Sequence, residues 1–330
     1  NGKTNSYVSI NGGRKIMQFN KSEPIAPIVN AVSSLFFEDN YAKYYDKIFA
    51  SISGGKEIFN GLRMNSSISY ENRKPLFNNA DWVILNKDDE QYSSNNPLEP
   101  ENYTSTPFDE HSIYKFSLDA TIKFGQKYIS YPDRKINIYE TKYPALNIGY
   151  SKGFAASDSK YNYDLVQARL YQDLKLGNKG TFSYNIKAGK FLNTDELSFT
   201  DYKHFNGNQT HVNLDLNYTN SFNLLPYYNL STDDQYAEFH AQHHFNGYLL
   251  RKIPLLNKLQ FQLVVGAKAL FTPDNKPYSE FSVGLDNIGF GKFRFLRVDY
   301  VRSYFSDKLT KSKSVQCYKE PREQKIYHAI

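Results

Sequence analysis

The chain has 330 residues, 40% of them hydrophobic and 16% aromatic, so its length allows one large β domain or two smaller domains with a sizeable core. Its mean hydropathy of −0.62 and the lack of a run of about 18 apolar residues exclude a helical membrane protein, whereas a membrane β-barrel, whose strands need only about 10 alternating residues, stays open. The net charge of +6, spread over scattered lysines, argues against nucleic acid as a partner, and the single cysteine, Cys317, excludes internal disulfides and zinc sites with several thiolates.

A β-hairpin and a helix are the first predicted elements. Residues 5–10 and 14–19 flank an Asn-Gly-Gly sequence, which is typical of a tight turn because glycine adopts positive φ without strain. After Pro27 the pattern changes, and apolar residues recur at helical spacing at Ile28, Val29, Val32, Leu35 and Phe36. This spacing predicts one short amphipathic helix near the N-terminus, packed across one end of a barrel.

Long alternating strands follow. In residues 113–124 the aromatic and aliphatic side chains occupy every second position, with lysine, serine and aspartate between them, so an extended chain has one apolar and one polar face. Similar segments lie near 62–71, 146–151, 166–173, 181–192, 236–245, 259–269, 280–286 and 296–305. Strands of soluble sandwiches usually run about five or six residues, so these longer segments favour a membrane barrel. Tyrosines near strand ends, such as Tyr236 and Tyr278, suggest aromatic girdles.

The connections are uneven in length. Residues 74–111 are rich in Asn, Asp, Ser and Pro, as expected of a long loop at one end of a membrane barrel. A polar aromatic loop at 201–211 precedes a further predicted strand at 210–219, and both flanking gaps are long. Consecutive connections in an up-and-down barrel lie at opposite ends, so two long neighbouring gaps conflict with this strand assignment. The sequence alone leaves the conflict open.

The loop at 201–211 and the later Leu-Leu-Pro-Tyr-Tyr segment contain aromatic and amide side chains that suit a packed polar plug, so we expect them to fold into or over the barrel. The candidate plug residues are Asp201, His204, Asn206, Gly207, Asn208, Gln209, Pro226, Tyr227 and Tyr228. Strand alternation predicts a second group of polar residues that face the lumen: Asn213, Asp215, Glu238, Gln242, Lys268 and Asp286.

Catalytic and metal chemistry has little support. Five of the seven histidines lie between residues 204 and 244, and His211, His240 and His244 fall on polar strand faces, which makes them weak metal candidates. A hydrolase with His211 as base and Ser183 or Ser282 as nucleophile is a further alternative, although no Gly-x-Ser-x-Gly motif is present. We therefore expect no enzyme activity, no metal and no cofactor.

Several short motifs, taken in order, resemble a known family. They are Gly61-Leu62, Arg73-Lys-Pro-Leu, Lys142-Tyr-Pro, Gly189-Lys-Phe-Leu, the loop at 201–210, Leu224-Leu-Pro-Tyr-Tyr, Lys252-Ile-Pro-Leu-Leu and Val283-Gly-Leu-Asp-Asn-Ile. The chain resembles the barrel-forming C-terminal part of uncharacterised outer-membrane proteins of Bacteroidota that carry a carboxypeptidase-regulatory-like domain at the N-terminus. That family is distantly similar to the surface-antigen and outer-membrane-assembly barrels.

The resemblance implies a location in the outer membrane of a Gram-negative bacterium. The implied partners are outer-membrane lipid and either envelope proteins or the regulatory-like domain, which this sequence does not contain. The implied function is envelope biogenesis or transport, through a polar lumen or a lateral seam. The alternative is a surface-exposed β protein that binds glycans or protein partners through loops rich in Tyr and Asn.

The predicted fold is all-β: an antiparallel transmembrane β-barrel of about 12–16 strands with one short helix near the N-terminus. The barrel domain is expected over residues 1–305. Residues 306–330 are charged and lack alternation, so we expect this tail to lie outside the barrel. The family would place one more closing strand there, and barrel closure is therefore left open.

Overall fold

The computed structural model describes residues 6–79, 82–84, 92–132, 135–138, 142–212, 218–305 and 326–329. Its main element is one antiparallel sheet of twelve strands, in which each strand pairs with its neighbours in chain order. These strands are β1 (Tyr7–Gln18), β2 (Tyr44–Phe59), β3 (Leu62–Pro75), β4 (His111–Lys123), β7 (Ala145–Phe154), β8 (Tyr163–Lys175), β9 (Thr181–Leu192), β10 (Gln235–His244), β11 (Gln262–Phe271), β12 (Tyr278–Phe290), β13 (Phe293–Phe305) and β14 (Ile326–Ala329).

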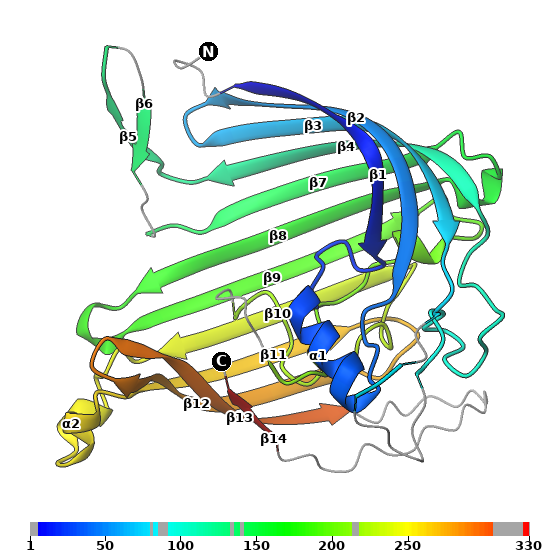
Figure 1. Cartoon of the computed structure of the whole chain (residues 1–330). Coiled ribbons are helices and arrows are strands. Elements are labelled where there is room, and N and C mark those ends of the chain that lie inside the picture. Colours follow the sequence, from blue (N-terminus) through cyan, green and yellow to red (C-terminus); the bar gives the residue numbers. More distant parts are fainter. Residues whose placement is uncertain are drawn as a thin grey trace.

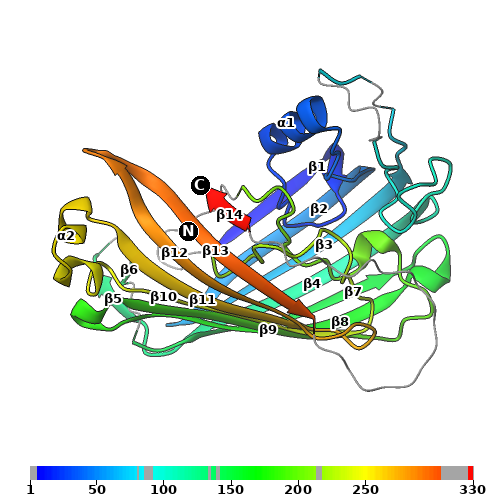
Figure 2. The same cartoon turned by 90° about the horizontal axis from the view of Figure 1, so that it is seen from below.

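The sheet curves into an open barrel, seen as a trough in Figure 2, with the helix α1 (Pro27–Phe37) on the concave side. β1 and β14 stand at the two ends of the strand order, so the barrel is open between them in the described structure. The predicted all-β antiparallel barrel is confirmed, and its twelve sheet strands fall within the expected range. The short elements are the hairpin β5 (Lys127–Ser130) and β6 (Lys135–Ile138), the helix α2 (Leu256–Leu259), and the 3-10 helices η1 (Ser159–Tyr161), η2 (Gly177–Lys179), η3 (Phe199–Asp201) and η4 (Leu250–Lys252).

The N-terminal region differs from the predicted hairpin. β1 is one continuous strand through the Asn-Gly-Gly sequence, and Gly12 and Gly13 pair with Ala50 and Phe49 of β2 without a break in register. The hairpin prediction is therefore wrong, because a complete backbone ladder with β2 outweighs the local turn preference. The predicted helix is present as α1, and neither helix of the described chain is long and apolar enough to cross a membrane.

The predicted strand at 210–219 is also wrong in the part that can be compared. Thr210 to Val212 and the residues from Tyr218 onward form turns and bends, and residues 213–217 lie outside the described residues. His211 has a φ of +58°, a left-handed conformation that interrupts an extended chain. The whole segment 193–234 is therefore one connection between β9 and β10, which removes the conflict between two consecutive long gaps.

The connections now fall into two groups. Strands β2 and β3 are joined by a tight turn at 60–61, and β12 and β13 by residues 291–292, both at one end of the barrel. The predicted long connection between β3 and β4 spans 76–110 at the other end, together with the β9–β10 connection. One end thus carries mostly short turns and the other mostly long loops, although the β5–β6 hairpin projects from the short-turn end (Figure 1).

Strand β14 corrects the expectation for part of the tail. Residues 326–329 pair antiparallel with Val298 to Val301 of β13, so this segment belongs to the sheet. The reason is that a bare strand edge offers a row of unpaired amides and carbonyls that an extended segment can join without side-chain alternation. Only four residues of β13 gain a partner in this way. Residues 306–325 lie outside the described residues, and the division into barrel domain and tail stays a prediction.

Many apolar side chains of the sheet face outward, while a smaller set, such as Ile113, Leu270 and Tyr278, is buried on the inner face. Ile10, Ile52, Ile68 and Phe116 are register partners across four strands, and the three isoleucines are 46–77% exposed. The inner face carries charged and polar rows instead. One such row contains His240, Lys268 and Glu280, which are at most 7% exposed. This distribution is the reverse of that in a soluble protein, where apolar side chains fill the core.

Candidate functional site

The segment 193–234, hereafter the inner loop, lies on the concave side of the sheet (Figure 2). Several of its side chains are almost completely buried against the strands: Phe199, Asp201, Phe205, Phe222 and Leu225. Phe205 and Phe222 pack with Tyr236, Leu270 and Tyr278 in one apolar cluster. Tyr236 and Tyr278 thus point inward to the loop, which corrects their assignment to an outward girdle.

The first anchor of the inner loop is Asp201, at the end of η3. Arg73 of β3 donates from Nη1 to Oδ2 of Asp201 at 2.5 Å and to Oγ1 of Thr200 at 2.8 Å. Lys115 of β4 lies 2.8 Å from the other oxygen, Oδ1, and the Tyr163 hydroxyl of β8 donates to the same atom at 3.1 Å. One carboxylate from the loop therefore holds three strands of the barrel wall.

A second carboxylate completes this buried ion cluster. Glu71 of β3 accepts from Arg73 at 2.6 Å and from Lys47 of β2 at 3.2 Å. Lys21, from the connection between β1 and β2, also reaches Oδ1 of Asp201 at 3.0 Å. Burial by itself raises the pKa of Asp201, but the positive charges of Arg73, Lys115 and Lys21 hold that pKa well below its usual range. The carboxylate is therefore charged, and the cluster is a set of ion pairs.

The second anchor lies near residue 223 of the inner loop. Glu280 of β12 accepts hydrogen bonds from the backbone amides of Asn223 at 2.7 Å and Leu224 at 2.8 Å. Lys268 of β11 donates to the Ser221 carbonyl at 2.6 Å and to the Asn223 side chain. Charged side chains of the wall thus satisfy backbone groups of the loop that would otherwise be buried without partners.

A third contact joins β9 and β10 to the loop. Lys187 donates to Oδ1 of Asn220 at 2.7 Å and to Oε1 of Glu238 at 3.0 Å. Glu238 also accepts from Nε2 of His240 at 2.7 Å, and the ring of Phe222 lies 4.6 Å from the imidazole. The inner loop is therefore fastened to the barrel wall at two separate places, near residue 201 and near residues 220–224.

His204 is a buried, neutral member of the inner loop. Its Nε2 lies 2.9 Å from the Phe199 carbonyl, which can only accept, so this nitrogen carries the proton. Its Nδ1 then accepts from the Ser231 hydroxyl at 2.7 Å. Burial, assisted by the charges of Lys21 and Lys203, lowers the pKa of His204 to about 3.

This shift predicts that docking of the inner loop depends on pH. The undocked imidazole takes up a proton near pH 6.5, whereas the docked one does so only near pH 3. Docking is therefore favoured at neutral pH and weakens as the pH falls below about 6.5. The free energy of docking decreases by several kcal/mol at most. The depressed pKa of Asp201 adds a loss only below about pH 4, so this carboxylate does not contribute to the change between pH 4 and 6.5.

The measurement is hydrogen exchange of the loop amides between pH 4 and 7, corrected for the intrinsic exchange rates. The matched control is His204→Gln, which keeps a donor for the Phe199 carbonyl but does not titrate. We expect the pH slope of protection to disappear in this variant. An equal slope in both proteins would show that His204 does not set the pH dependence.

The other candidate plug residues hold the inner loop together. Asn208 donates its amide to the Leu225 carbonyl at 3.0 Å, and Gln209 accepts from the Tyr227 amide at 3.0 Å. A Cβ on Gly207 would lie 2.3 Å from the Leu225 carbonyl oxygen, so this close approach of two backbone segments requires glycine. The two halves of the loop thus support each other.

Asn206, Pro226 and Tyr228 complete the candidate set. Asn206 accepts from Asn20 at 3.1 Å and donates to the Asn220 carbonyl at 3.0 Å. Tyr228 packs near the ring of Phe199, and Pro226 follows the buried Leu225. The structure therefore places all nine candidate plug residues within one folded loop.

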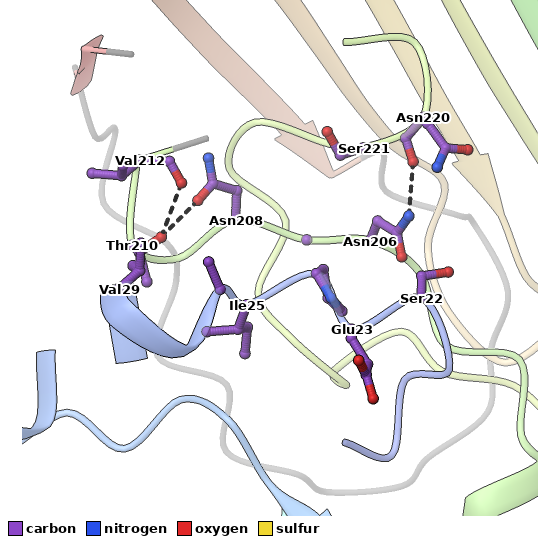
Figure 3. Close-up of a pocket in the computed structure, with 13 residues that line it drawn as sticks. Ser22, Glu23, Ile25, Val29, Asn206, Asn208, Thr210, Val212, Asn220 and Ser221 are labelled. Carbon is purple, nitrogen blue, oxygen red and sulfur yellow. Dashed lines mark hydrogen bonds between the residues drawn. The ribbon is translucent and has the colours of Figure 1, made fainter. Parts of the chain in front are cut away.

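A cavity of about 320 Å³ lies between the inner loop and the start of α1. Figure 3 shows Ile25 and Val29 on one side and Asn208, Thr210 and Ser221 on the other. Its lining combines amide and hydroxyl groups with aliphatic side chains and carries one charged side chain, Glu23. This composition suits a neutral polar ligand better than an ion.

The predicted lumen-facing residues divide into two groups. Glu238 and Lys268 are buried on the inner face, Gln242 accepts from Arg297 at 3.0 Å, and Asp286 pairs with His244 at 2.9 Å. Asn213 and Asp215 lie outside the described residues. The side chains on the described strands thus bond to one another or to the inner loop.

The three weak metal candidates occupy separate environments. His240 bonds to Glu238, His244 bonds to Asp286, and His211 lies in the inner loop, where its predicted strand is absent. Within the described parts of the chain, no group of three or more potential ligands could hold a metal ion. Ser183 and Ser282 lie on β9 and β12, and the hydrolase alternative stays untested.

The main contacts of the site were not singled out from the sequence. Arg73, Glu71, Lys115, Lys187 and Glu280 carry most of the anchoring, yet none is among the predicted site residues. A signal existed for Lys115, which alternation places on the polar face of its strand. What the pattern does not contain is the identity of the partner across the barrel.

Comparison with known proteins identifies a matching family and a similar solved structure. Residues 1–285 match the C-terminal domain of a family of unknown function, DUF5686. The chain is also similar to the crystal structure of BamA from Haemophilus ducreyi lacking POTRA domains 1-3, with a TM-score of 0.49 and 10% identity. That similarity covers 98% of this chain and only 60% of the other. None of the curated proteins matches. The match to an uncharacterised family agrees with the resemblance, while the regulatory-like domain and the bacterial phylum stay predictions.

Proposed function

We propose that this chain, which belongs to the C-terminal domain family DUF5686 of unknown function, is an outer-membrane β-barrel. Its proposed role is in envelope biogenesis or in transport. The inner loop acts as the gate of its polar lumen. The location is the outer membrane of a Gram-negative bacterium, and the first partner is membrane lipid. Envelope proteins or an N-terminal regulatory-like domain are further proposed partners.

The observation that carries this proposal is the reversed distribution of side chains. The outer face exposes many large apolar side chains, and they are aligned in register across neighbouring strands, as at Ile52 and Ile68. A soluble monomer rarely exposes an apolar patch of more than a few hundred Å². A band of this extent around a wall of ten- to sixteen-residue strands matches the lipid-facing surface of a membrane barrel.

The gating role is supported by how the inner loop is attached. It occupies the concave side through ion pairs and hydrogen bonds at Asp201 and Glu280, with aromatic clusters between them. When the loop leaves, water can replace these ion pairs and hydrogen bonds. The strands keep the backbone hydrogen bonds that pair them with one another. The loop can therefore undock without unfolding the wall.

Shortening the inner loop tests the gate. Lys203 and Thr232 form a two-way backbone bridge, at 2.8 and 3.1 Å, so residues 204–231 can be replaced by an Asn-Gly turn that joins these neighbours. We expect the shortened barrel to conduct ions in planar lipid bilayers, in steps at least several times larger than those of the intact chain. The removed segment includes the part that covers β10 to β12.

The matched control shortens the β5–β6 hairpin, which forms a separate sheet at the other end. That variant should keep the conductance of the intact chain. Equal conductance of the intact and loop-shortened chains, with both shown to be folded by heat-modifiable mobility, would contradict the gate.

The alternative of a surface-exposed β protein that binds glycans or partners draws support from the amide-rich cavity in Figure 3. The two proposed functions differ in what the apolar outer face contacts. A chain that stays monomeric and folded without detergent would favour the alternative, whereas dependence on detergent or lipid favours the barrel. No catalytic role is proposed for either.

A further inference from the structure

A second cavity, of about 260 Å³, lies between the inner loop and the barrel wall. Its wall side is formed by β4, β7, β8 and β9, and the rest comes from the inner loop and the connection between β1 and β2. Three lysines from three different elements line it: Lys21, Lys115 and Lys203. Ser117, Ser151 and Gln167 add hydroxyl and amide groups from the inner face of the strands.

Positive charge exceeds negative charge at this cavity. Lys21 and Lys115 both lie within 3.0 Å of the same atom, Oδ1 of Asp201, so two ammonium groups crowd at one oxygen. The other oxygen, Oδ2, is taken by Arg73. In the cluster as a whole, Lys21, Lys47, Arg73 and Lys115 share the two carboxylates of Glu71 and Asp201.

Lys203 adds a further positive charge. Its Nζ lies 5.7 Å from the ring centre of Phe205 and 5.1 Å from that of Tyr236, and within the described chain its ammonium forms no ion pair with a carboxylate. The aromatic faces hold this side chain beside the cavity. Three lysines and the carboxylate of Asp201 therefore line one small space, and Glu238 next to it also interacts electrostatically with Lys203.

We propose that this cavity binds a phosphoryl group. Lys115 is largely buried, whereas the Lys21 side chain is half exposed at the rim. An excess of positive charge in such a partly buried space is unfavourable unless a counter-charge accompanies it. The excess here matches a phosphate, which carries about two negative charges and accepts several hydrogen bonds, better than a carboxylate with one. The volume admits the phosphoryl group as free phosphate. It also admits the phosphodiester of a lipid headgroup, which carries one negative charge and whose tails stay outside. This inference does not rest on membrane insertion or gating.

The test uses the full chain in a nonionic detergent and a buffer free of phosphate and sulfate. Inorganic phosphate is titrated by calorimetry, with chloride at equal ionic strength as the reference. We expect saturable phosphate binding that weakens at least tenfold in Lys203→Gln and in Lys21→Gln, since each removes a charged donor. Lys74→Gln is the matched control, because this half-exposed lysine pairs with Glu110 away from the cavity.

A second arm separates the two sources of the ligand. The chain is refolded into vesicles of phosphatidylcholine with or without phosphatidylglycerol, and phosphate is titrated again. Weaker apparent phosphate affinity with phosphatidylglycerol identifies a lipid headgroup as the competing ligand, whereas unchanged affinity identifies free phosphate. Heat-modifiable mobility confirms that each variant is folded. The proposal is overturned if the folded wild type binds no phosphate, or if the two cavity variants bind it as tightly as Lys74→Gln.

Discussion

Replacing Asp201 by asparagine is expected to release the inner loop from the barrel wall. The variant leaves Arg73, Lys115 and Lys21 around a neutral amide, and Arg73 is completely buried. Removing one partner of a buried ion pair costs about 3 to 5 kcal/mol. Arg73 keeps its ion pair with Glu71 in this variant, so we expect a loss at the lower end of that range. We expect hydrogen-exchange protection of residues 199–232 to fall by the corresponding factor, while the strand ladder stays protected.

Asp173→Asn is the matched control, because Asp173 lies exposed on β8, and its replacement should change stability by about 0.5 kcal/mol or less. A double-mutant cycle of Asp201→Asn with Arg73→Met then isolates the coupling between the two side chains. If the loop amides are as well protected from hydrogen exchange in Asp201→Asn as in Asp173→Asn, the ion cluster does not dock the loop.

Leu118→Arg is expected to impair folding into lipid vesicles far more than Asp119→Arg. The two residues are neighbours near the middle of β4, and they point to opposite faces of the sheet. Leu118 lies on the same face as the exposed Tyr114, whereas Asp119 shares the inner face with Ile113 and Lys115. An arginine on the lipid face near the membrane midplane costs about 2 to 4 kcal/mol, and one facing the lumen much less.

The measurement is the free energy of unfolding in urea from vesicles of defined lipid, with refolding followed by heat-modifiable mobility. Equal losses for the two arginines would contradict the assigned orientation of the wall. A smaller loss for Leu118→Arg than for Asp119→Arg would show that Leu118 faces water instead of lipid.

The sequence by itself determined the class of fold and the direction of the strand faces. Alternation in residues 113–124 predicts β4 almost residue by residue, because successive side chains of a strand must point to opposite sides. Helical spacing from Ile28 to Phe36 likewise predicts α1. These patterns are local, so neighbouring residues suffice to reveal them.

The site was predictable only in part. The composition of residues 201–211 marked Asp201 and His204 as members of one polar aromatic loop, but it did not identify Arg73, which lies 128 residues from Asp201 along the chain. Periodicity tells which face of a strand a side chain occupies. It contains no information on which distant carboxylate will meet it.

Tertiary structure also overruled two local patterns. Gly12 and Gly13 favour a turn, yet pairing with β2 along the whole of β1 satisfies more backbone groups than a hairpin of two short strands would. Residues 210–212 alternate like a strand, but Thr210 bonds to Asn208 and to the Val212 carbonyl, and His211 turns left-handed. Along β1 the free energy of long-range pairing outweighs a local preference of about 1 kcal/mol or less. Just before Thr210, the chain is held by bonds of Asn208 to Leu225 and of Gln209 to Tyr227, and only the folded loop brings those residues together.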